Sequence, residues 1–510
     1  MSLNNNPFEL GKHANRMELP PLMWSPDDND SINPHGLVCG TSGSGKTTLI
    51  RKIVENLVEQ GKHVYVFDLK GDMQFQDKQG HTIGNYMNIT AWDSEYGINP
   101  FEFDTGVPKD ELELLIVNPK VITKEQEFKV RNSGPRTQVE LMIEIIRKNF
   151  LPNMGAMQRD YLMYLLTDTY TASGFKYNDI NTWTKELPTL KDTLELIKMI
   201  SIYNDRIVDV NDEYSSDFIT SLKTNIVGVS ALKKRLLEEE PEGDEKDKLE
   251  TLIKEKESSM DSEYREFKEV AATKYGPKDI EKLDHEEWFK TRGINPEKYG
   301  AKGAMKTIEA LNSYLSALDT SEIFKDKKPP VKTGLNIINI SGLSHQIQKV
   351  LVDIWLGKVF RACKIRGKYE DREDKSRGRK CDTFVVIDES KLISGEGKDK
   401  KDPFSFLNRI ATESRGNGLG ILVGAQSADH FPPEFLKNFS LQIILNTSIA
   451  DAEVVRKGFG VDKEMLKYTQ DKQNNALVKK NKEFVKIKLS HFRENINEED
   501  GHVTISTKSP

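Results

Sequence analysis

The chain has 510 residues, of which 30% are charged and 37% are hydrophobic, a composition typical of a globular protein with several domains. Its formal net charge of −6 argues against a protein that binds nucleic acid through a general basic surface, although not against a ring with a few inward-facing cations. No apolar run reaches the roughly 18 residues of a membrane span, and the N-terminus lacks the pattern of a signal peptide. We therefore expect a cytoplasmic protein without direct membrane insertion, whose cysteines Cys39, Cys363 and Cys381 are reduced thiols.

The first strongly patterned segment begins at His35. His35–Gly40 is a short apolar run that predicts a buried strand, and Lys46–Gln60 has the single apolar stripe of an amphipathic helix. Gly61 ends this helix, and Val64–Phe67 predicts a second buried strand. A strand, a helix and a strand in this order form a βαβ unit, which implies a parallel sheet.

The turn between the first strand and the helix carries a phosphate-binding pattern. It reads Gly40-Thr41-Ser42-Gly43-Ser44-Gly45-Lys46-Thr47, which fits G-x-x-x-x-G-K-[ST] between a strand and a helix. The glycines let backbone N–H groups converge on phosphate oxygens, and the helix N-terminus adds partial positive charge. We predict that the segment through Thr48 binds ATP, with Lys46 at the β- and γ-phosphates and the Thr47 hydroxyl on Mg²⁺.

The middle of the chain has a different pattern. From about Asp110 to about Lys328 the periodicity is mostly helical, with amphipathic stretches at Gln158–Tyr170 and Thr189–Ile202. Residues 232–293 are rich in Glu and Lys, which indicates a solvated helical arm.

Strand patterns return in the last third of the chain. We expect strands at 334–340, 383–389, 420–425 and 441–445, helices at 345–363 and 403–414, and a β-hairpin at 476–489. The fold class is therefore α/β, a RecA-like P-loop NTPase core with a mainly parallel sheet, interrupted by a large all-α insertion. The expected parts are an N-terminal segment (1–34), the first part of the core (35–110), the insertion (111–330, with its charged arm at about 232–293), the second part of the core with the hairpin (331–492) and a tail (493–510).

Polar residues end three of the expected strands. Asp388 follows the run Phe384–Ile387 and can hold Mg²⁺ through its water, while Glu389 can orient or deprotonate the attacking water, which favours hydrolysis over a kinase reaction. Gln426 ends a later strand and can contact the γ-phosphate or its water. Asp68 ends the second strand, where it either supports the water or metal or serves the turn.

Two arginines flank the end of the helix expected at 403–414. A charge-stabilising arginine is needed where γ-phosphate transfer is fast, and Arg409 and Arg415 are the candidates, with a solvated helix end as the alternative. Arg415 lies at the N-terminal side of its strand, on the edge opposite its own P-loop. We therefore expect it to act in the site of a neighbouring subunit.

The order of these segments resembles the HerA/FtsK superfamily of ring ATPases, especially its HerA and conjugation-motor branches. The part from Thr412 to Gln426 is the most specific to that family, and the charged arm lies outside the resemblance. The matching stretches are FELGK, HGLVCGTSGSGKTTLI, YVFDLKGD, GINPFEF, LNIINISGLSHQIQKVLVDIWLGKVF, FVVIDESKLI and ATESRGNGLGILVGAQSADHFPPEFLKNFSLQIILNTS.

The resemblance implies a homohexamer with ATP between subunits, DNA in the central channel and Arg415 inserted into the neighbour's site. Such proteins often carry a sizeable N-terminal domain that docks a nuclease or a membrane partner, whereas only 34 residues precede His35 here. Either the branch lacks that domain or the chain is partial, and a nuclease or other effector is a candidate partner.

Three functions are open at this point. The first is a hexameric, helicase-like DNA translocase in DNA processing, anti-phage defence or conjugative transfer, with Lys398, Lys400 and Lys401 of the loop 394–402 touching DNA phosphates unless that loop is merely solvated. The second is a type IV secretion assembly ATPase that acts on protein. The third is a nucleotide-gated structural ring with little turnover, which the intact P-loop and acidic pair argue against.

Overall fold

The structure of the chain is a computed structural model. It describes residues 7–28, 31–77, 80–90, 95–107, 109–118, 123–131, 133–213, 232, 246–256, 258, 285–300, 303–366, 381–389, 410, 412–428, 431, 433–472, 474–480 and 483–490. The loop 394–402 with its three lysines, Arg409, most of the charged arm and the tail 493–510 lie outside the described residues. The chain forms two compact units, Met1–Gly155 with Tyr314–Pro510, and Ala156–Ser313.

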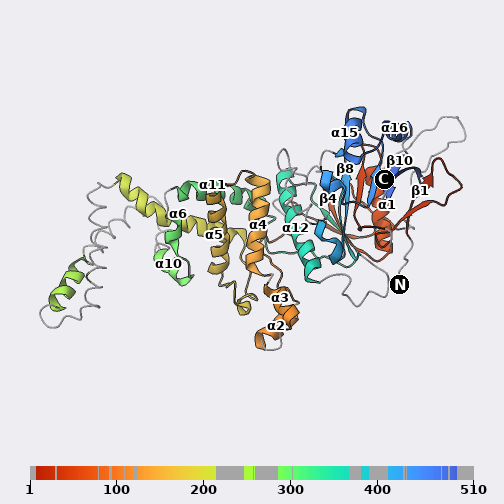
Figure 1. Cartoon of the computed structure of the whole chain (residues 1–510). Coiled ribbons are helices and arrows are strands. Elements are labelled where there is room, and N and C mark those ends of the chain that lie inside the picture. Colours follow the sequence, from red (N-terminus) through yellow and green to blue (C-terminus); the bar gives the residue numbers. More distant parts are fainter. Residues whose placement is uncertain are drawn as a thin grey trace. The chain divides into compact units, whose positions relative to one another are not determined.

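The first unit is built on an 11-stranded sheet of described residues, in the order β2-β1-β11-β10-β9-β3-β8-β7-β4-β6-β5 (Figure 1). The run from β9 to β5 is parallel, and β10, β11, β1 and β2 continue it antiparallel. This confirms the predicted α/β core with a mainly parallel sheet. The strands are β1 (Phe8–His13), β2 (Leu22–Trp24), β3 (Gly36–Cys39), β4 (His63–Asp68), β5 (Asn85–Asn88), β6 (Leu335–Asn339), β7 (Thr383–Ile387), β8 (Leu419–Ala425), β9 (Leu441–Ile444), β10 (Asn475–Lys480) and β11 (Phe484–Leu489).

Helices cover both faces of this sheet. The apolar stripe of α1 (Lys46–Glu59) packs with Val66 and other residues of the same sheet face in one buried cluster. Phe67, the next residue of β4, points to the other face because side chains alternate along a strand, and its ring meets Trp355 of α12 (His345–Ile365) edge-on, with ring centroids 6.0 Å apart. Figure 1 accordingly shows α1 and α12 on opposite sides of the strands.

Parallel pairing brings the C-terminal ends of the central strands to one edge. Cys39 at the end of β3 is in register with Ala425 at the end of β8, and Ile387 at the end of β7 is in register with Phe67 of β4. The segments that leave these strands therefore emerge side by side, although they come from distant parts of the sequence. Of the predicted site residues that the structure describes, all except Arg415 lie at this edge.

The N-terminal residues belong to the same sheet, a placement that the sequence pattern did not predict. β1 pairs with β11 on one side and β2 on the other. After β2, Asp27 accepts a hydrogen bond from the fully buried Lys62, which also donates one to the carbonyl oxygen of Cys381. A buried ammonium needs such partners because it loses its hydration, so this contact fixes the N-terminal segment against the core.

The remaining helices lie around the sheet or in the second unit. Those of the first unit are α2 (Lys109–Val117), α3 (Lys124–Arg131), α4 (Pro135–Phe150), the 3₁₀ helix η8 (Arg415–Asn417), α14 (Pro433–Leu436), α15 (Ile449–Phe459) and α16 (Lys463–Asp471). The second unit holds α5 (Ala156–Ala172), η2 (Ile180–Thr182), α6 (Leu190–Glu213), α10 (His285–Thr291), η3 (Pro296–Tyr299) and the start of α11 (Ala304–Asp319). Among the described residues, none of the helices combines the length and the hydropathy that crossing a bilayer requires.

Candidate nucleotide site

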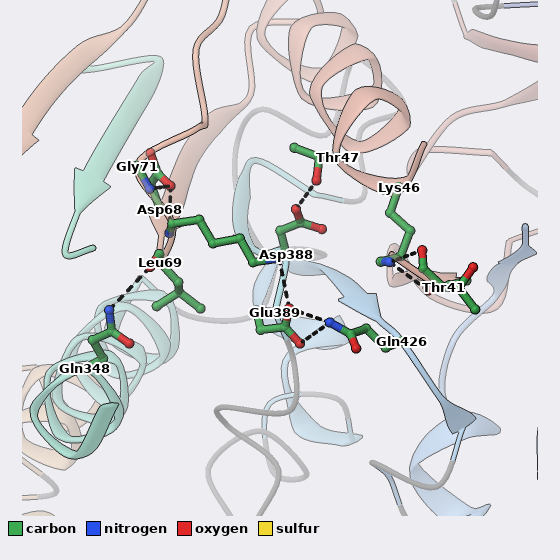
Figure 2. Close-up of polar contacts among 12 residues, drawn as sticks. Thr41, Lys46, Thr47, Asp68, Leu69, Gly71, Gln348, Asp388, Glu389 and Gln426 are labelled. Atoms are coloured by element: carbon green, nitrogen blue, oxygen red, sulfur yellow. Dashed lines mark hydrogen bonds and ion pairs between the residues drawn. The ribbon is translucent and has the colours of Figure 1, made fainter. Parts of the chain in front are cut away.

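Lys46, which follows the turn between β3 and α1, folds back onto that turn and forms hydrogen bonds with its backbone. The Lys46 ammonium donates hydrogen bonds to the carbonyl oxygens of Gly40, at 2.7 Å, and Thr41, at 2.8 Å (Figure 2). Gly43 and Gly45 have φ values of 76° and 87°, in the left-handed region that side chains disfavour. The turn can therefore wrap around Lys46 only because glycines occupy these two positions.

Burial shapes the chemistry of this turn. It lowers the pKa of Lys46, while the charges of Asp388 and Glu389 act in the opposite direction. The buried Ser44 hydroxyl has no hydrogen-bond partner among the described residues. An unsatisfied buried donor is costly, and here it stands in a loop that also presents an ammonium. These groups suit an anion such as a phosphate.

The first residue after Lys46 reaches across to β7. The Thr47 hydroxyl donates a 2.5 Å hydrogen bond to Oδ2 of Asp388 (Figure 2). The other oxygen, Oδ1, is buried without a hydrogen-bond partner among the described residues. Burial raises the pKa of Asp388, and the Thr47 hydrogen bond partly offsets that effect. A hydroxyl and a carboxylate with an unpartnered oxygen are ligand types that Mg²⁺ prefers.

Glu389, the next residue, is held by two side chains from neighbouring strands. The Gln426 amide donates to Oε2 at 3.1 Å and to Oε1 at 3.4 Å (Figure 2). The Lys70 ammonium lies 3.0 Å from Oε2. Sequence analysis did not single out Lys70, although it stands two residues beyond the strand end at Asp68, within a stretch that matches the HerA/FtsK pattern.

Asp68 is engaged with its own turn. Its Oδ1 accepts from the backbone N–H groups of Lys70, Gly71 and Asp72 at 3.2, 2.7 and 3.2 Å, and its Oδ2 accepts from Met73 at 3.0 Å. This carboxylate serves the turn that carries Lys70, which is the second of the two roles considered for it. A contact with water or metal stays a prediction.

Arg415 is not brought to this edge. It begins η8, directly before β8, whereas Gln426 directly follows β8, so the two lie at opposite ends of the same strand. The segment around it contacts the rest of the same chain through a 2.7 Å ion pair between Lys364 and Glu413 and through a 3.0 Å hydrogen bond from Asp382 N–H to the Gly418 carbonyl. A role for Arg415 in a neighbour's site stays a prediction.

Comparison with known proteins fits this geometry. Residues 8–131 match the family described as Helicase HerA, central domain, which confirms the predicted resemblance over these residues. No curated protein matches the sequence. The fold is similar to VirB4 of Thermoanaerobacter pseudethanolicus, with 13% identity and a TM-score of 0.53 over 95% of this chain and 96% of that one.

Two further solved structures are more distantly similar. The bacterial conjugative coupling protein TrwBΔN70 matches with 14% identity and a TM-score of 0.40, over 90% of this chain and 85% of that one. The cytoplasmic domain of the type VII secretion ATPase EccC from Thermomonospora curvata matches with 11% identity and a TM-score of 0.27, over 98% of this chain and 30% of that domain. The VirB4 likeness, over nearly the whole of both chains, is the one that supports a shared fold.

Proposed function

We propose that this chain, which carries the HerA central-domain pattern in its first 131 residues, is an ATP-hydrolysing motor that acts as a homohexamer on DNA in its central channel. The observation that carries the proposal is the set of Lys46, Thr47, Asp388, Glu389 and Gln426 at one edge of a parallel sheet. Ligands of open α/β sheets bind at that edge.

The described residues fit ATP and Mg²⁺. The turn from Gly40 to Lys46 offers backbone N–H groups, the Ser44 hydroxyl and the Lys46 ammonium to the phosphates. Thr47 and Asp388 would hold the metal, and the unpartnered Oδ1 of Asp388 could accept a hydrogen bond from a water of its coordination shell. When bound, Mg²⁺ supplies neutralisation of charge on the phosphate oxygens.

Hydrolysis then depends on the carboxylate beside the metal ligands. Glu389 accepts a proton from the attacking water, so the proton ends on its carboxylate. Gln426 orients that carboxylate through its amide. Arg415 of the adjacent subunit would stabilise charge on the transferred phosphoryl group. Outside the catalytic core, residues 111–330 would form a helical insertion domain.

A second candidate is a type IV secretion assembly ATPase that acts on protein. The observation that favours it is the near full-length fold similarity to VirB4. Both candidates hydrolyse ATP through the same residues, and they differ in what stimulates turnover.

The test is steady-state ATP hydrolysis by the full chain with single-stranded DNA, duplex DNA or no DNA. The DNA motor should hydrolyse ATP faster with at least one form of DNA, and Glu389→Gln should remove both the basal and the stimulated rate. Hydrolysis that depends on Glu389 but ignores both forms of DNA would favour the secretion ATPase. A wild-type rate in Glu389→Gln would overturn the hydrolysis proposal itself.

A further inference from the structure

Lys70 reaches the site from a turn that the mechanism above does not use. Its side chain is half exposed, yet its ammonium lies 3.0 Å from Oε2 of Glu389. Burial acts against its charged form, but the hydrogen bond and charge of Glu389 outweigh burial and raise the pKa of Lys70. The charge of Lys70 also acts on Lys46 and Asp388. The charge of Lys70 therefore interacts with Lys46, Asp388 and Glu389, three of the residues of the candidate site.

The turn that carries Lys70 is fixed on several sides. The four hydrogen bonds accepted by Asp68 hold its backbone from residue 70 to residue 73. Gln348 of α12 donates a hydrogen bond to the Leu69 carbonyl at 3.4 Å, and Arg51 of α1 donates one to the Asp72 carbonyl. These hydrogen bonds hold the backbone of the turn in place, so the flexible side chain of Lys70 extends towards the end of β7 from a fixed backbone position.

The donors around Glu389 are unevenly shared between its two oxygens. Oε2 accepts from Lys70 at 3.0 Å and from Gln426 at 3.1 Å. Oε1 accepts only the 3.4 Å bond from Gln426 among the described residues. A carboxylate pinned through one oxygen keeps the lone pairs of the other for a further donor. Of the two pinning groups Lys70 is charged, and charge-assisted hydrogen bonds are the stronger kind.

We propose that Lys70 is a positioning residue, which with Gln426 pins Oε2 of Glu389 so that Oε1 receives the proton of the attacking water. This rests on the proposed function. Lys70 acts through Glu389 and not on the phosphates, so it should affect kcat and leave nucleotide binding unchanged. A direct contact between Lys70 and a phosphate is the competing role, and it would appear in KM and in nucleotide affinity.

The first arm of the test compares single variants of the full chain. Lys70→Met should lower kcat by about 10- to 100-fold, the range typical of partners that orient a site residue, with unchanged KM and unchanged affinity for a fluorescent ATP analogue. Lys70→Arg keeps the cation and should restore most of the rate. The matched control is Lys52→Met, because Lys52 is 46% exposed and makes a 2.8 Å pair with Glu55 on the surface of α1. It should change neither constant.

The second arm is a double-mutant cycle. If Lys70 acts through Glu389, adding Lys70→Met to Glu389→Gln should change neither the residual single-turnover hydrolysis rate nor the affinity for the fluorescent ATP analogue. A further loss there, or a raised KM in the single variant, would overturn the positioning role in favour of a phosphate contact. A wild-type kcat in Lys70→Met beside an inactive Glu389→Gln would overturn the inference alone. Wild-type activity in Glu389→Gln would overturn both the inference and the proposed function.

Discussion

The hydroxyl of Thr47 donates a 2.5 Å hydrogen bond to the carboxylate of Asp388, across 341 positions of sequence. One partner begins the helix after the phosphate-binding turn, and the other directly follows β7. Neither needs the other for its local structure. Their contact exists because the parallel strands β3 and β7 end at the same edge of the sheet.

Lys46 and Glu389 should fail in different ways. Lys46→Ala removes the ammonium that the turn offers to the β- and γ-phosphates, and it should therefore abolish ATP binding. Glu389→Gln keeps the shape but removes the base, so ATP should bind and persist. Equilibrium binding of labelled ATP and a single-turnover assay measure the two effects. Equal binding defects in both variants would contradict the assignment.

The ionised Asp388 carboxylate should lower the free energy of unfolding at neutral pH when no metal is bound. Its pKa is raised by burial, so the folded state holds this proton more tightly than the unfolded state, and stability is lost as pH rises through the folded pKa. Asp388→Asn should therefore raise the free energy of unfolding by about 0.5–2 kcal/mol at neutral pH, the usual size of a stabilising substitution. The gain should shrink as the pH is lowered.

Urea unfolding in EDTA at several pH values measures this gain, with the exposed Asp160→Asn as the control. Adding Mg²⁺ and ADP should stabilise the wild type by mass action and the Asp388→Asn variant much less. A pH-independent difference between the two proteins would mean that the carboxyl proton is not its cause.

Gly424 should not tolerate a side chain. A Cβ atom on this residue of β8 would stand 2.4 Å from the backbone oxygen of Asp388 and 2.5 Å from its Oδ1. Gly424→Ala must displace the residue after β7, at a cost of about 1–3 kcal/mol in folding free energy together with weaker Mg²⁺-dependent nucleotide binding. Gly342→Ala is the control, because its Cβ would meet no atom within 4 Å. Calorimetry measures the folding stability of the two variants, and titration measures their affinity for nucleotide. Equal values for both variants would contradict the prediction.

Arg415 should act in trans. Arg415→Ala should lower hydrolysis by about 10³–10⁵-fold and leave ATP binding intact. The control Arg136→Ala, at an exposed residue, should change neither hydrolysis nor ATP binding. Inactive Lys46→Ala and inactive Arg415→Ala chains, mixed before assembly, should regain activity, since some interfaces then join an intact P-loop to an intact arginine. No recovery in verified mixed rings would favour an arginine that acts within its own subunit.

The lysines of the loop 394–402 should contact DNA phosphates. Replacing Lys398, Lys400 and Lys401 by alanine should weaken DNA binding and flatten its salt dependence by about 0.9 in slope for each duplex phosphate that the variant no longer neutralises. Replacing Lys246, Lys248 and Lys254, which lie on the charged arm, makes the same charge change and should leave the slope unaltered. Binding curves at several salt concentrations compare the two triple variants, and equal slopes would place the DNA path elsewhere.

Much of the core could be predicted from the sequence because its signals are local. The apolar stripe of α1 and the glycines beside it specify a strand, turn and helix without reference to the rest of the chain. The acidic pair after β7 and Gln426 after β8 were predicted in the same way, and the structure brings them to the P-loop. β1 and β5 were not predicted from the sequence, because FELGKH and NYMN contain polar or glycine residues that weaken a strand pattern.

Local sequence patterns specify which segments form strands around the turn and which residues end them. They do not specify the order of the strands in the sheet, since β3 and β4 follow each other along the chain yet are separated by β8 and β7. The pairing of Lys70 with Glu389 depends on that order, because it joins the turn after β4 to the end of its neighbour β7. Periodicity reports the face of a strand but not its neighbour, and contacts between distant segments are set by packing over the whole sheet.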